Sequence, residues 1–279
     1  MLAWWAESGI PSAQQVELSL VSALDWSSLP RSVHPEAGHL PHARLERKCA
    51  QLSSLAGPIS QLASPDHLIV DFCSGGGHLG LLLAHLLPSS TVHMVENKEE
   101  SLARARVRGI QCDLHNVWFY QCNLEFYRGS FDLGCSLHAC GAATDLVIAK
   151  CLKHRAAFVS CPCCYGGVST SLGVLEYPRS EVIHYRISIL RITTINMCDI
   201  QMFRGSSLPL SSYEVVAHCA DQTHAGDMKS SQGFLCMDIV DTDRCEAARE
   251  QGYTVTLSKL QPPNCTPKNN LIVGQPTEP

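Results

Sequence analysis

Three cysteines fall within four positions of one short segment, "FVSCPCCYGG" at residues 158–167. Thiols this close together can bind a metal, form a redox pair, attack a substrate or simply line a pocket. A redox pair is typically spaced C-x-x-C, which only Cys161 and Cys164 satisfy. A nucleophilic thiolate needs a nearby cation, and no Lys or Arg adjoins these cysteines. Along an extended chain Cys161 and Cys163 point one way and Cys164 the other, so we expect at most two of them to share a site.

A second segment, "HACGAATD" at residues 138–145, offers an imidazole and another thiol. Both segments follow strands that we expect to be neighbours in a sheet, so the side chains of His138, Cys140, Cys161 and Cys163 should converge. They could supply four zinc ligands, but C-x-C combined with H-x-C departs from the usual C-x₂₋₄-C spacing, and we predict no metal. The expected substrate pocket is instead lined by small or rigid side chains, namely Cys140, Cys161, Pro162, Cys163 and Tyr165.

His138 is the candidate catalytic residue. An imidazole titrates near neutral pH and could remove a proton from a hydroxyl or a protonated nitrogen, which typically adds about 10² to 10⁴ in rate. The alternative is a histidine that only hydrogen-bonds its own turn. Asp145, together with Thr144, is expected to open the helix that follows, because acidic residues favour helix N-termini.

A glycine-rich loop, "VDFCSGGGHLG" at residues 70–80, is typical of a nucleotide-cofactor site. A strand ends at Asp71, and Gly75, Gly76 and Gly77 allow a sharp turn and close approach of a ligand before a helix N-terminus. The spacing of Gly75, Gly77 and Gly80 also satisfies the dinucleotide pattern G-x-G-x-x-G, which would favour a nicotinamide cofactor. However, Asp71 precedes Gly75 by four positions, as in the loops of S-adenosylmethionine enzymes, so that cofactor is the better match.

Two polar side chains complete the expected cofactor site. Glu96 ends the second strand and could accept hydrogen bonds from both ribose hydroxyls. Asn123 follows the third strand, where an amide could contact the adenine edge. We therefore predict S-adenosylmethionine bound near Asp71, Gly75, Gly77, Glu96 and Asn123.

The elements that position these residues are short apolar runs alternating with helical patterns. Strands are predicted at residues 67–72, 91–97, 116–122, 131–137 and 156–161, helices at 78–87, 98–109 and 144–155, and then a helix at 234–252 and strands at 253–260 and 269–274. Such alternation predicts parallel βαβ units with ligands beyond the carboxyl ends of the strands. The expected fold class is therefore α/β, a Rossmann-like doubly wound sheet with a short helical N-terminal extension.

The chain is divided by this pattern into two parts. Residues 1–64 are interpreted as an N-terminal leader and helical extension, with a helix over residues 43–57 that ends at Gly57-Pro58. Residues 65–279 form the cofactor-binding domain. Residues 186–212 fit neither pattern and are interpreted as an insert.

Composition narrows the range of partners. The chain has 279 residues and a formal charge of -5, which argues against a wholly basic nucleic-acid coat and against DNA as a partner. Arg44, Arg47 and Lys48 nevertheless form a local basic patch that could contact RNA. Fifteen scattered cysteines indicate reduced thiols in the cytosol. The longest apolar run is about half of the roughly 20 residues that span a bilayer, and the first residues lack a targeting pattern, so a cytoplasmic location without membrane contact is expected.

Several segments together resemble one known family. "IVDFCSGGGHLGLLLAHLLPSSTVHMVENKEESLARA", "SLHACGAATDLVIAKCLKHRAAFVSCPCCYG", "ADQT" and "TPKNNLIVG" are similar to the methyltransferase domain of the glutathione S-transferase C-terminal domain-containing proteins. The resemblance covers most of residues 26–279 and implies a class I, S-adenosylmethionine-dependent methyltransferase domain over residues 65–279. Asp71, Gly75, Gly77 and Glu96 fall on the family's cofactor motifs, whereas Cys73 replaces the usual first glycine of the loop. The family's N-terminal transferase-like domain has no counterpart here, so no glutathione chemistry is expected.

The thiol segments also resemble those of a eukaryotic tRNA 2′-O-methyltransferase family. The expected function is therefore an S-adenosylmethionine-dependent methyltransferase, with tRNA-like RNA as the expected acceptor class. Two alternatives stay open, a nicotinamide-dependent oxidoreductase of Rossmann type and a non-catalytic methyltransferase-like scaffold. In the favoured interpretation the enzyme chiefly holds acceptor and methyl group in line, for which effective molarities of about 10⁵ M are attainable.

Overall fold

The computed structural model describes residues 24–38, 41–167, 175–181, 210–223 and 228–277. The interpreted insert at 186–212 lies outside these ranges except for residues 210–212. Within the described ranges no helix combines the length and apolar character needed to cross a membrane.

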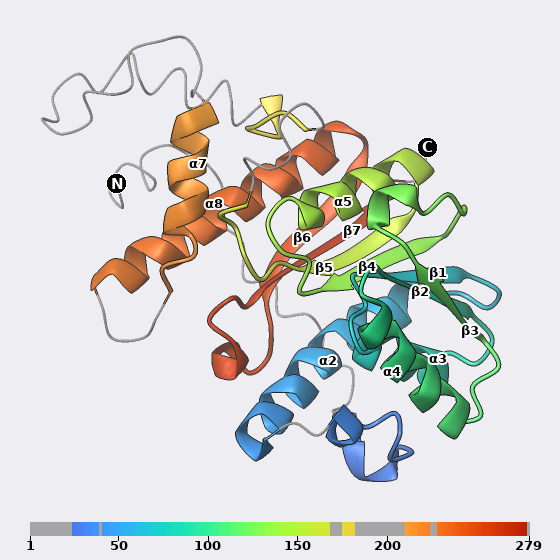
Figure 1. Ribbon diagram of the computed structural model, residues 1–279. Coiled ribbons are helices and arrows are strands. Elements are labelled where there is room, and N and C mark those ends of the chain that lie inside the picture. The colour runs from blue at the N-terminus through green and yellow to red at the C-terminus, as the bar shows by residue number, and fades with distance from the viewer. Residues whose placement is uncertain (1–23, 39–40, 168–174, 182–209, 224–227, 278–279) are drawn as a thin grey trace, which may run out of the picture.

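A seven-stranded sheet forms the centre of the molecule (Figure 1). Its strands are β1 Leu68–Phe72, β2 Thr91–Glu96, β3 Val117–Gln121, β4 Leu133–Leu137, β5 Ala157–Cys161, β6 Tyr253–Lys259 and β7 Asn270–Pro276. Their order is β3-β2-β1-β4-β5-β7-β6, and β1 to β5 pair in parallel, whereas β7 is antiparallel to both of its neighbours. The order reverses between β1 and β4, and ligands of open α/β sheets bind at such a switch point.

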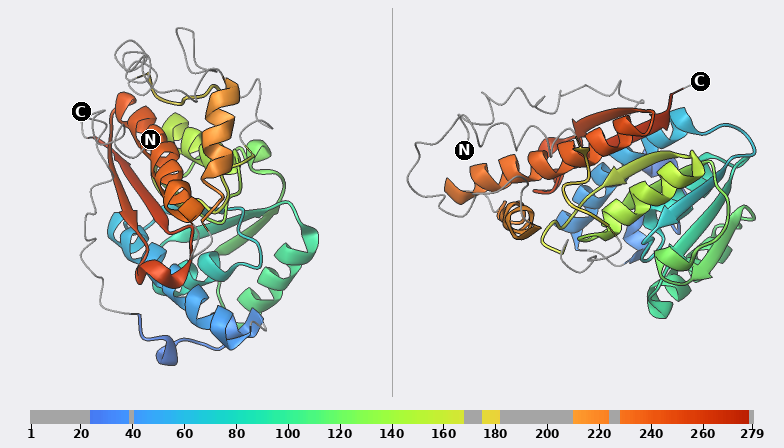
Figure 2. Two further views of the ribbon diagram at one scale, coloured as in Figure 1. Left: turned by 90° about the vertical axis from the view of Figure 1, so that its left-hand side faces the viewer. Right: turned by 90° about the horizontal axis from the view of Figure 1, so that it is seen from above.

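Helices cover both faces of the sheet (Figures 1 and 2). They are α2 His42–Leu62, α3 His78–Leu86, α4 Glu99–Gln111, α5 Ala143–His154, α7 Leu210–Cys219 and α8 Met228–Glu250, with short 3-10 turns η1 Trp26–Ser28, η2 Pro35–Gly38, η3 Leu124–Phe126 and η5 Pro263–Cys265. Helices α2, α3 and α4 share one hydrophobic core with the sheet, and α5 and α8 share a second core on the other face. The predicted Rossmann-like, doubly wound α/β fold is confirmed.

The first βα unit shows why the sequence folds this way. Strand β1 reads "LIVDF", and four of its five residues are buried, as expected for a parallel strand covered on both faces. Helix α3 follows with six consecutive buried residues from Leu79 to Ala84, because it packs between the sheet, α2 and α4. The loop between them is thereby fixed at both ends, over the carboxyl edge of the sheet.

The predicted end of the first helix at Gly57-Pro58 is wrong, because α2 continues through Pro58 to Leu62. A proline inside a helix costs about 3 kcal/mol. Leu52, Leu55 and Ile59 are fully buried in the main core, and each such side chain contributes about 1.5–3 kcal/mol, which outweighs that cost. The helix is further tied to the distant turn after β6, where the Ser54 hydroxyl accepts from the Gln261 amide at 2.9 Å and donates to its carbonyl at 3.0 Å. The helix predicted at 234–252 likewise begins earlier, at Met228.

Candidate cofactor and substrate site

A cavity of about 260 Å³ lies where β1, β2 and β4 end. Its wall consists of Lys48, Asp71, Cys73, Ser74, Gly75, Gly76, His78, Leu79, Glu96, Lys98, Ser101, Leu137 and His138. The wall thus includes five residues that the sequence singled out, namely Asp71, Cys73, Gly75, Glu96 and His138. The wall also combines two acidic side chains, Asp71 and Glu96, with two basic ones, Lys48 and Lys98.

The loop glycines differ in their roles. Gly75 has φ +56°, and a Cβ added there would meet nothing within 4 Å, so the main chain faces open space at this point. Gly77 does not line the cavity. It precedes α3 with φ +76°, and an added Cβ would lie 2.6 Å from the Cβ of Ala105 on α4. Gly77 therefore permits close helix packing behind the loop, while Gly75 permits approach of a ligand in front of it.

Glu96 holds the glycine loop. One carboxylate oxygen accepts from the Gly75 amide at 2.8 Å and the other accepts from the Lys98 amide at 2.9 Å. A carboxylate oxygen can accept more than one hydrogen bond, so both can still receive hydroxyl groups of a ligand. Asp71 lies deeper and accepts from the Gly80 amide at 2.9 Å, and burial raises its pKa to about 7.

The loop also carries an unsatisfied polar atom. The Ser74 hydroxyl is buried and has no hydrogen-bond partner in the structure, although Ser74 lines the cavity. Buried hydroxyls without a partner are costly and rare in proteins. Together with the open face of Gly75 and the Glu96 carboxylate, this hydroxyl fits a ligand that bears several polar groups, as a nucleoside cofactor does.

The sequence analysis missed Arg108, which anchors the loop from behind. Its guanidinium is 6% exposed and donates to the Gly76 carbonyl at 3.0 Å, and to the carbonyls of Ser32 and Val33 at 2.8 and 3.1 Å. It also contacts His78, whose pKa is lowered to about 3 by burial and by this cation. An arginine within the helix that follows the second strand gives no distinctive sequence signal.

Lys48 has a different environment from Arg44 and Arg47, the other two residues of the proposed basic patch. Lys48 lines the cavity, and burial lowers its pKa while the charge of Asp71 opposes that shift. Arg44 and Arg47 remain exposed on α2. Their contact with RNA stays a prediction, and Lys48 is part of the cavity wall.

His138 lies at the edge of the cavity, on the turn after β4. Its backbone is in the left-handed region with φ +76°, and its amide donates to the Cys161 carbonyl at 3.3 Å. The residue keeps solvent contact, but burial on its inner side and the Lys48 ammonium lower its pKa to about 4. At pH 7 the imidazole is therefore neutral and able to accept a proton, but it is a weaker base than a histidine with an ordinary pKa.

Two other polar residues have partners different from those expected. Asn123 is not part of the cavity wall, and its Oδ1 accepts from the Asn97 amide group at 3.1 Å, so adenine contact stays a prediction. Asp145 lies in the first turn of α5, as expected, but its side chain does not cap the helix. It is fully buried and receives two hydrogen bonds from Arg244 of α8, at 2.7 and 3.0 Å, because burial of its charge requires a cation.

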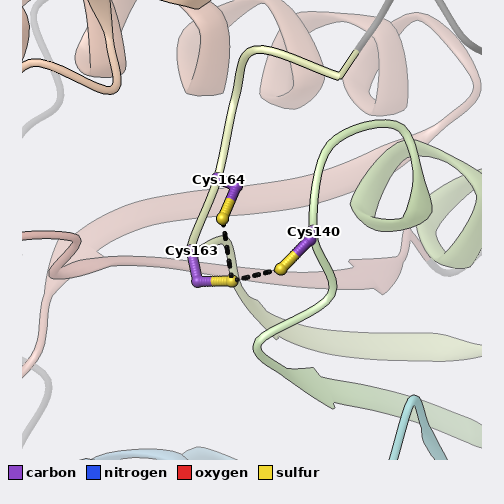
Figure 3. Close-up of side chains that lie close together, drawn as sticks. All are labelled: Cys140, Cys163 and Cys164. Atoms are coloured by element: carbon purple, nitrogen blue, oxygen red, sulfur yellow. Dashed lines mark hydrogen bonds between the residues drawn. The ribbon is translucent and has the colours of Figure 1, made fainter.

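The cysteines converge in a different combination from the predicted one. Cys161 is 1% exposed and belongs to the main core. The sulfurs of Cys163 and Cys164 instead both lie within 4.8 Å of the Cys140 sulfur (Figure 3). Strand β5 ends at Cys161, so the alternation of side chains along a strand does not apply to the two later residues. The Cys140–Cys163 contact of 2.9 Å lowers the pKa of Cys140 to about 6 and raises that of Cys163.

Two expected pocket residues are buried instead. Pro162 is buried beside Cys161, and the Tyr165 side chain is fully buried in a third core formed with α7 and α8. The Tyr165 hydroxyl donates to Asp241 at 2.6 Å, which explains why a polar tip is accommodated there. In this structure neither side chain lines the cavity.

Sequence comparison places these features in a known family. The profile of a family described as "Methyltransferase domain" matches residues 47–171. The glutathione S-transferase C-terminal domain-containing protein of Bos taurus is 42% identical over 255 residues, which cover 91% of this chain and 37% of the relative. The chain belongs to the family of glutathione S-transferase C-terminal domain-containing proteins. The Drosophila melanogaster homolog is 41% identical over 258 residues, covering 90% of this chain and 40% of the homolog. The chain spans less than half the length of these relatives, and its family carries a methyltransferase domain.

Solved structures of similar shape are more distant. A ribosomal protein L11 methylase from Lactobacillus delbrueckii subsp. bulgaricus is 9% identical with a TM-score of 0.43, covering 82% of this chain and 79% of that chain. An RNA methyltransferase from Salinibacter ruber in complex with S-adenosyl-L-homocysteine is 17% identical with a TM-score of 0.33. The match covers 38% of this chain and 72% of that chain.

Proposed function

We propose that this chain transfers the methyl group of S-adenosylmethionine to an RNA acceptor at the cavity between β1, β2 and β4. The observation that carries the cofactor assignment is the polar cradle at residues 74–75 and Glu96. An unpartnered buried hydroxyl, an open stretch of main chain and a carboxylate lie together on one wall. Asp71 and Lys48 lie on the same wall.

Each residue of the cradle would have a separate task. Glu96 would accept hydrogen bonds from the ribose hydroxyls, Ser74 would donate to a polar group of the cofactor, and Gly75 would let the cofactor approach the main chain. When bound, S-adenosylmethionine supplies a methyl group that is already electrophilic because its sulfur is a sulfonium. The protein therefore chiefly has to orient the acceptor and exclude water.

His138 would take the proton that the acceptor loses. It lies on the cavity wall, is neutral at pH 7, and keeps a face toward solvent from which the acceptor could enter. A hydroxyl or protonated nitrogen would give its proton to the imidazole as the bond to the methyl carbon forms.

RNA is proposed as the acceptor because of charge near the entrance. Arg44 and Arg47 are exposed on α2, four positions and one position before Lys48, which lines the cavity. Guanidinium groups in this position could pair with phosphates and direct a nucleotide toward the site. The same cations would repel a positively charged protein segment.

Two measurements test the proposal separately. Calorimetric titration should show S-adenosylmethionine binding and no NAD binding, and the reverse result would favour a nicotinamide-dependent oxidoreductase. Incubation with radiolabelled methyl donor and total RNA should then give label that ribonuclease removes. Binding of the cofactor with label only in protein would refute the RNA acceptor, and binding without any transfer from a complete cell extract would indicate a scaffold.

A further inference from the structure

The turns after β4 and β5 bring three thiols to one point outside the proposed cofactor wall. The sulfurs of Cys140, Cys163 and Cys164 all lie within 4.8 Å of one another. Figure 3 shows Cys163 and Cys164 on one turn and Cys140 on the other, with the sulfurs directed toward each other. The separations are 2.9 Å between Cys140 and Cys163 and 3.7 Å between Cys163 and Cys164.

We propose that Cys140, Cys163 and Cys164 form a three-thiolate site for Zn²⁺, with the fourth coordination position open to an external ligand. Zn–S bonds are about 2.3 Å long, so sulfurs around tetrahedral zinc lie about 3.8 Å apart. The Cys163–Cys164 separation of 3.7 Å is close to that value, and the Cys140–Cys163 separation of 2.9 Å would have to lengthen by about 0.9 Å. Binding requires only small movements of side chains, with the thiol protons released to water.

The main chain holds the two turns together independently of the sulfurs. Cys140 and Cys164 form an isolated parallel β-bridge, and the Gly141 amide donates to the Cys164 carbonyl at 3.0 Å. Gly141 has φ +57°, and a Cβ there would lie 3.0 Å from the Cα of Gly167, so glycine is needed for this close approach. A site whose ligands are positioned by the backbone loses little freedom when an ion binds.

The second turn is fixed by the "ADQT" segment, to which the proposed methyl transfer assigns no role. Both oxygens of Asp221 accept backbone amides, from Tyr165 at 3.0 Å and from Gly166 at 2.8 Å. Lys268 pairs with the same carboxylate at 3.3 Å. Asp221 thus holds the thiol turn in place, and its carboxylate does not belong to the group of side chains with metal-ligand spacing.

The number of ligands indicates an open site. Within the described residues, only these three side chains form a group with metal-ligand spacing. Structural zinc sites are normally closed by four protein ligands, whereas sites with three keep a position for water or substrate. Cys140 is exposed, so a small molecule can reach the ion from solvent. Lys98 and Lys268 act electrostatically on Cys140 and Cys164, and their charges would offset the net negative charge of three thiolates around Zn²⁺.

The decisive experiment uses the full chain, reduced and stripped of metal, and titrated with Zn²⁺ alone in competition with a chromophoric chelator. We expect one equivalent of Zn²⁺ per chain, and loss of that equivalent in Cys140→Ser and in Cys164→Ser. Cys112→Ser is the matched control. Cys112 follows the last turn of α4, away from the turns after β4 and β5, so this variant should still bind one equivalent of Zn²⁺. Because S-adenosylmethionine is absent, the outcome is independent of the proposed methyl transfer.

Cobalt provides a readout that needs no variant. Co²⁺ in the same site should show sulfur-to-cobalt charge transfer from three thiolates and the absorption of tetrahedral cobalt, and added imidazole should shift that absorption. Failure of the reduced chain to bind Zn²⁺, or retention of the equivalent by both serine variants, would overturn the site. A Cys140–Cys163 disulfide that forms in the metal-free chain, with no Zn²⁺ bound after reduction, would assign the thiols to redox chemistry instead. A cobalt spectrum unaffected by imidazole would overturn the open position.

Discussion

The carboxylate of Glu96 at the end of β2 accepts a 2.8 Å hydrogen bond from the amide of Gly75 in the loop after β1. Two neighbouring parallel strands are thereby joined at their carboxyl ends, at the edge where the cavity opens. The carboxylate orders the loop before any ligand arrives, and the same group is available to ribose hydroxyls. Its two tasks make it the most informative position for a cofactor-binding test.

We expect Glu96→Gln to weaken S-adenosylmethionine binding about 10- to 150-fold. A glutamine side chain offers only one acceptor oxygen where two backbone amides now donate, and hydrogen bonds to a charged group contribute about 1.5–3 kcal/mol. Calorimetric titration measures the change. Glu100→Gln, at an exposed position of α4, should bind like the wild type. Equal affinities for both variants would show that Glu96 does not contact the cofactor.

His138→Asn should lower kcat by about 10² to 10⁴ while leaving the cofactor affinity unchanged, because only the proton acceptor is removed. Asparagine adopts the left-handed backbone conformation that position 138 requires, so the turn should be retained. The rate of methyl transfer at saturating cofactor gives kcat, and a binding titration of the same variant gives the cofactor affinity. An unaltered kcat would reduce His138 to a structural residue of its turn.

Gly77→Ala should destabilise the fold more than Gly75→Ala. Both positions have positive φ, which costs a non-glycine residue about 1–2 kcal/mol. At Gly77 the new methyl group would also meet Ala105 at 2.6 Å, which adds about 1–3 kcal/mol of overpacking. Urea unfolding of the two variants measures the difference. If Gly75→Ala proved the more destabilising, helix packing would not be the role of Gly77.

The buried Asp71 predicts a pH dependence of stability. Burial raises its pKa from 3.8 to about 7, so the folded chain keeps this proton over a range in which the unfolded chain has lost it. The contribution of Asp71 to the free energy of unfolding should therefore decrease as pH rises from about 4 to 7, by a few kcal/mol, since one pKa unit corresponds to about 1.4 kcal/mol. Asp71→Asn should lack this decrease and still accept from the Gly80 amide. The free energy of unfolding of both proteins is measured by denaturation across this pH range. The same change with pH in the wild type and the variant would contradict the prediction.

Arg244→Met should cost about 3–5 kcal/mol of stability. Arg244 is 1% exposed and pairs with Asp145 at 2.7 Å and with Asp241 at 2.8 Å, so its loss leaves two carboxylates buried without their cation. Arg249→Met is the matched control on the same helix, since its partly exposed pair with Glu246 is worth about 1 kcal/mol or less. Chemical denaturation compares the two. Similar losses would mean that the buried network is not important for stability.

The alternation of apolar strands and helices between residues 67 and 161 is enough to predict the doubly wound sheet. Asp71, Gly75 and Glu96, which the sequence assigns to a cofactor, line one cavity, and their contact with a cofactor stays a prediction. Three features of the structure could not be predicted from the pattern of the sequence. Pro58 stays within α2 because tertiary burial outweighs local preference. Cys164 joins Cys140 because the chain leaves strand geometry after Cys161. Arg108 reaches the loop through contacts whose partners lie 32 to 76 positions away in sequence.

The hydrogen bonds between Ser54 and Gln261 join positions 207 apart in the sequence. Helix α2 leaves the ribosome ahead of every strand, whereas the turn that completes its docking follows 207 positions after Ser54. Until then the apolar face around Leu52 and Leu55 lacks the part of its cover that η5 and β7 supply, and exposed apolar surface favours aggregation or chaperone binding. Packing of this helix should accordingly be completed only after the turn that follows β6 has left the ribosome.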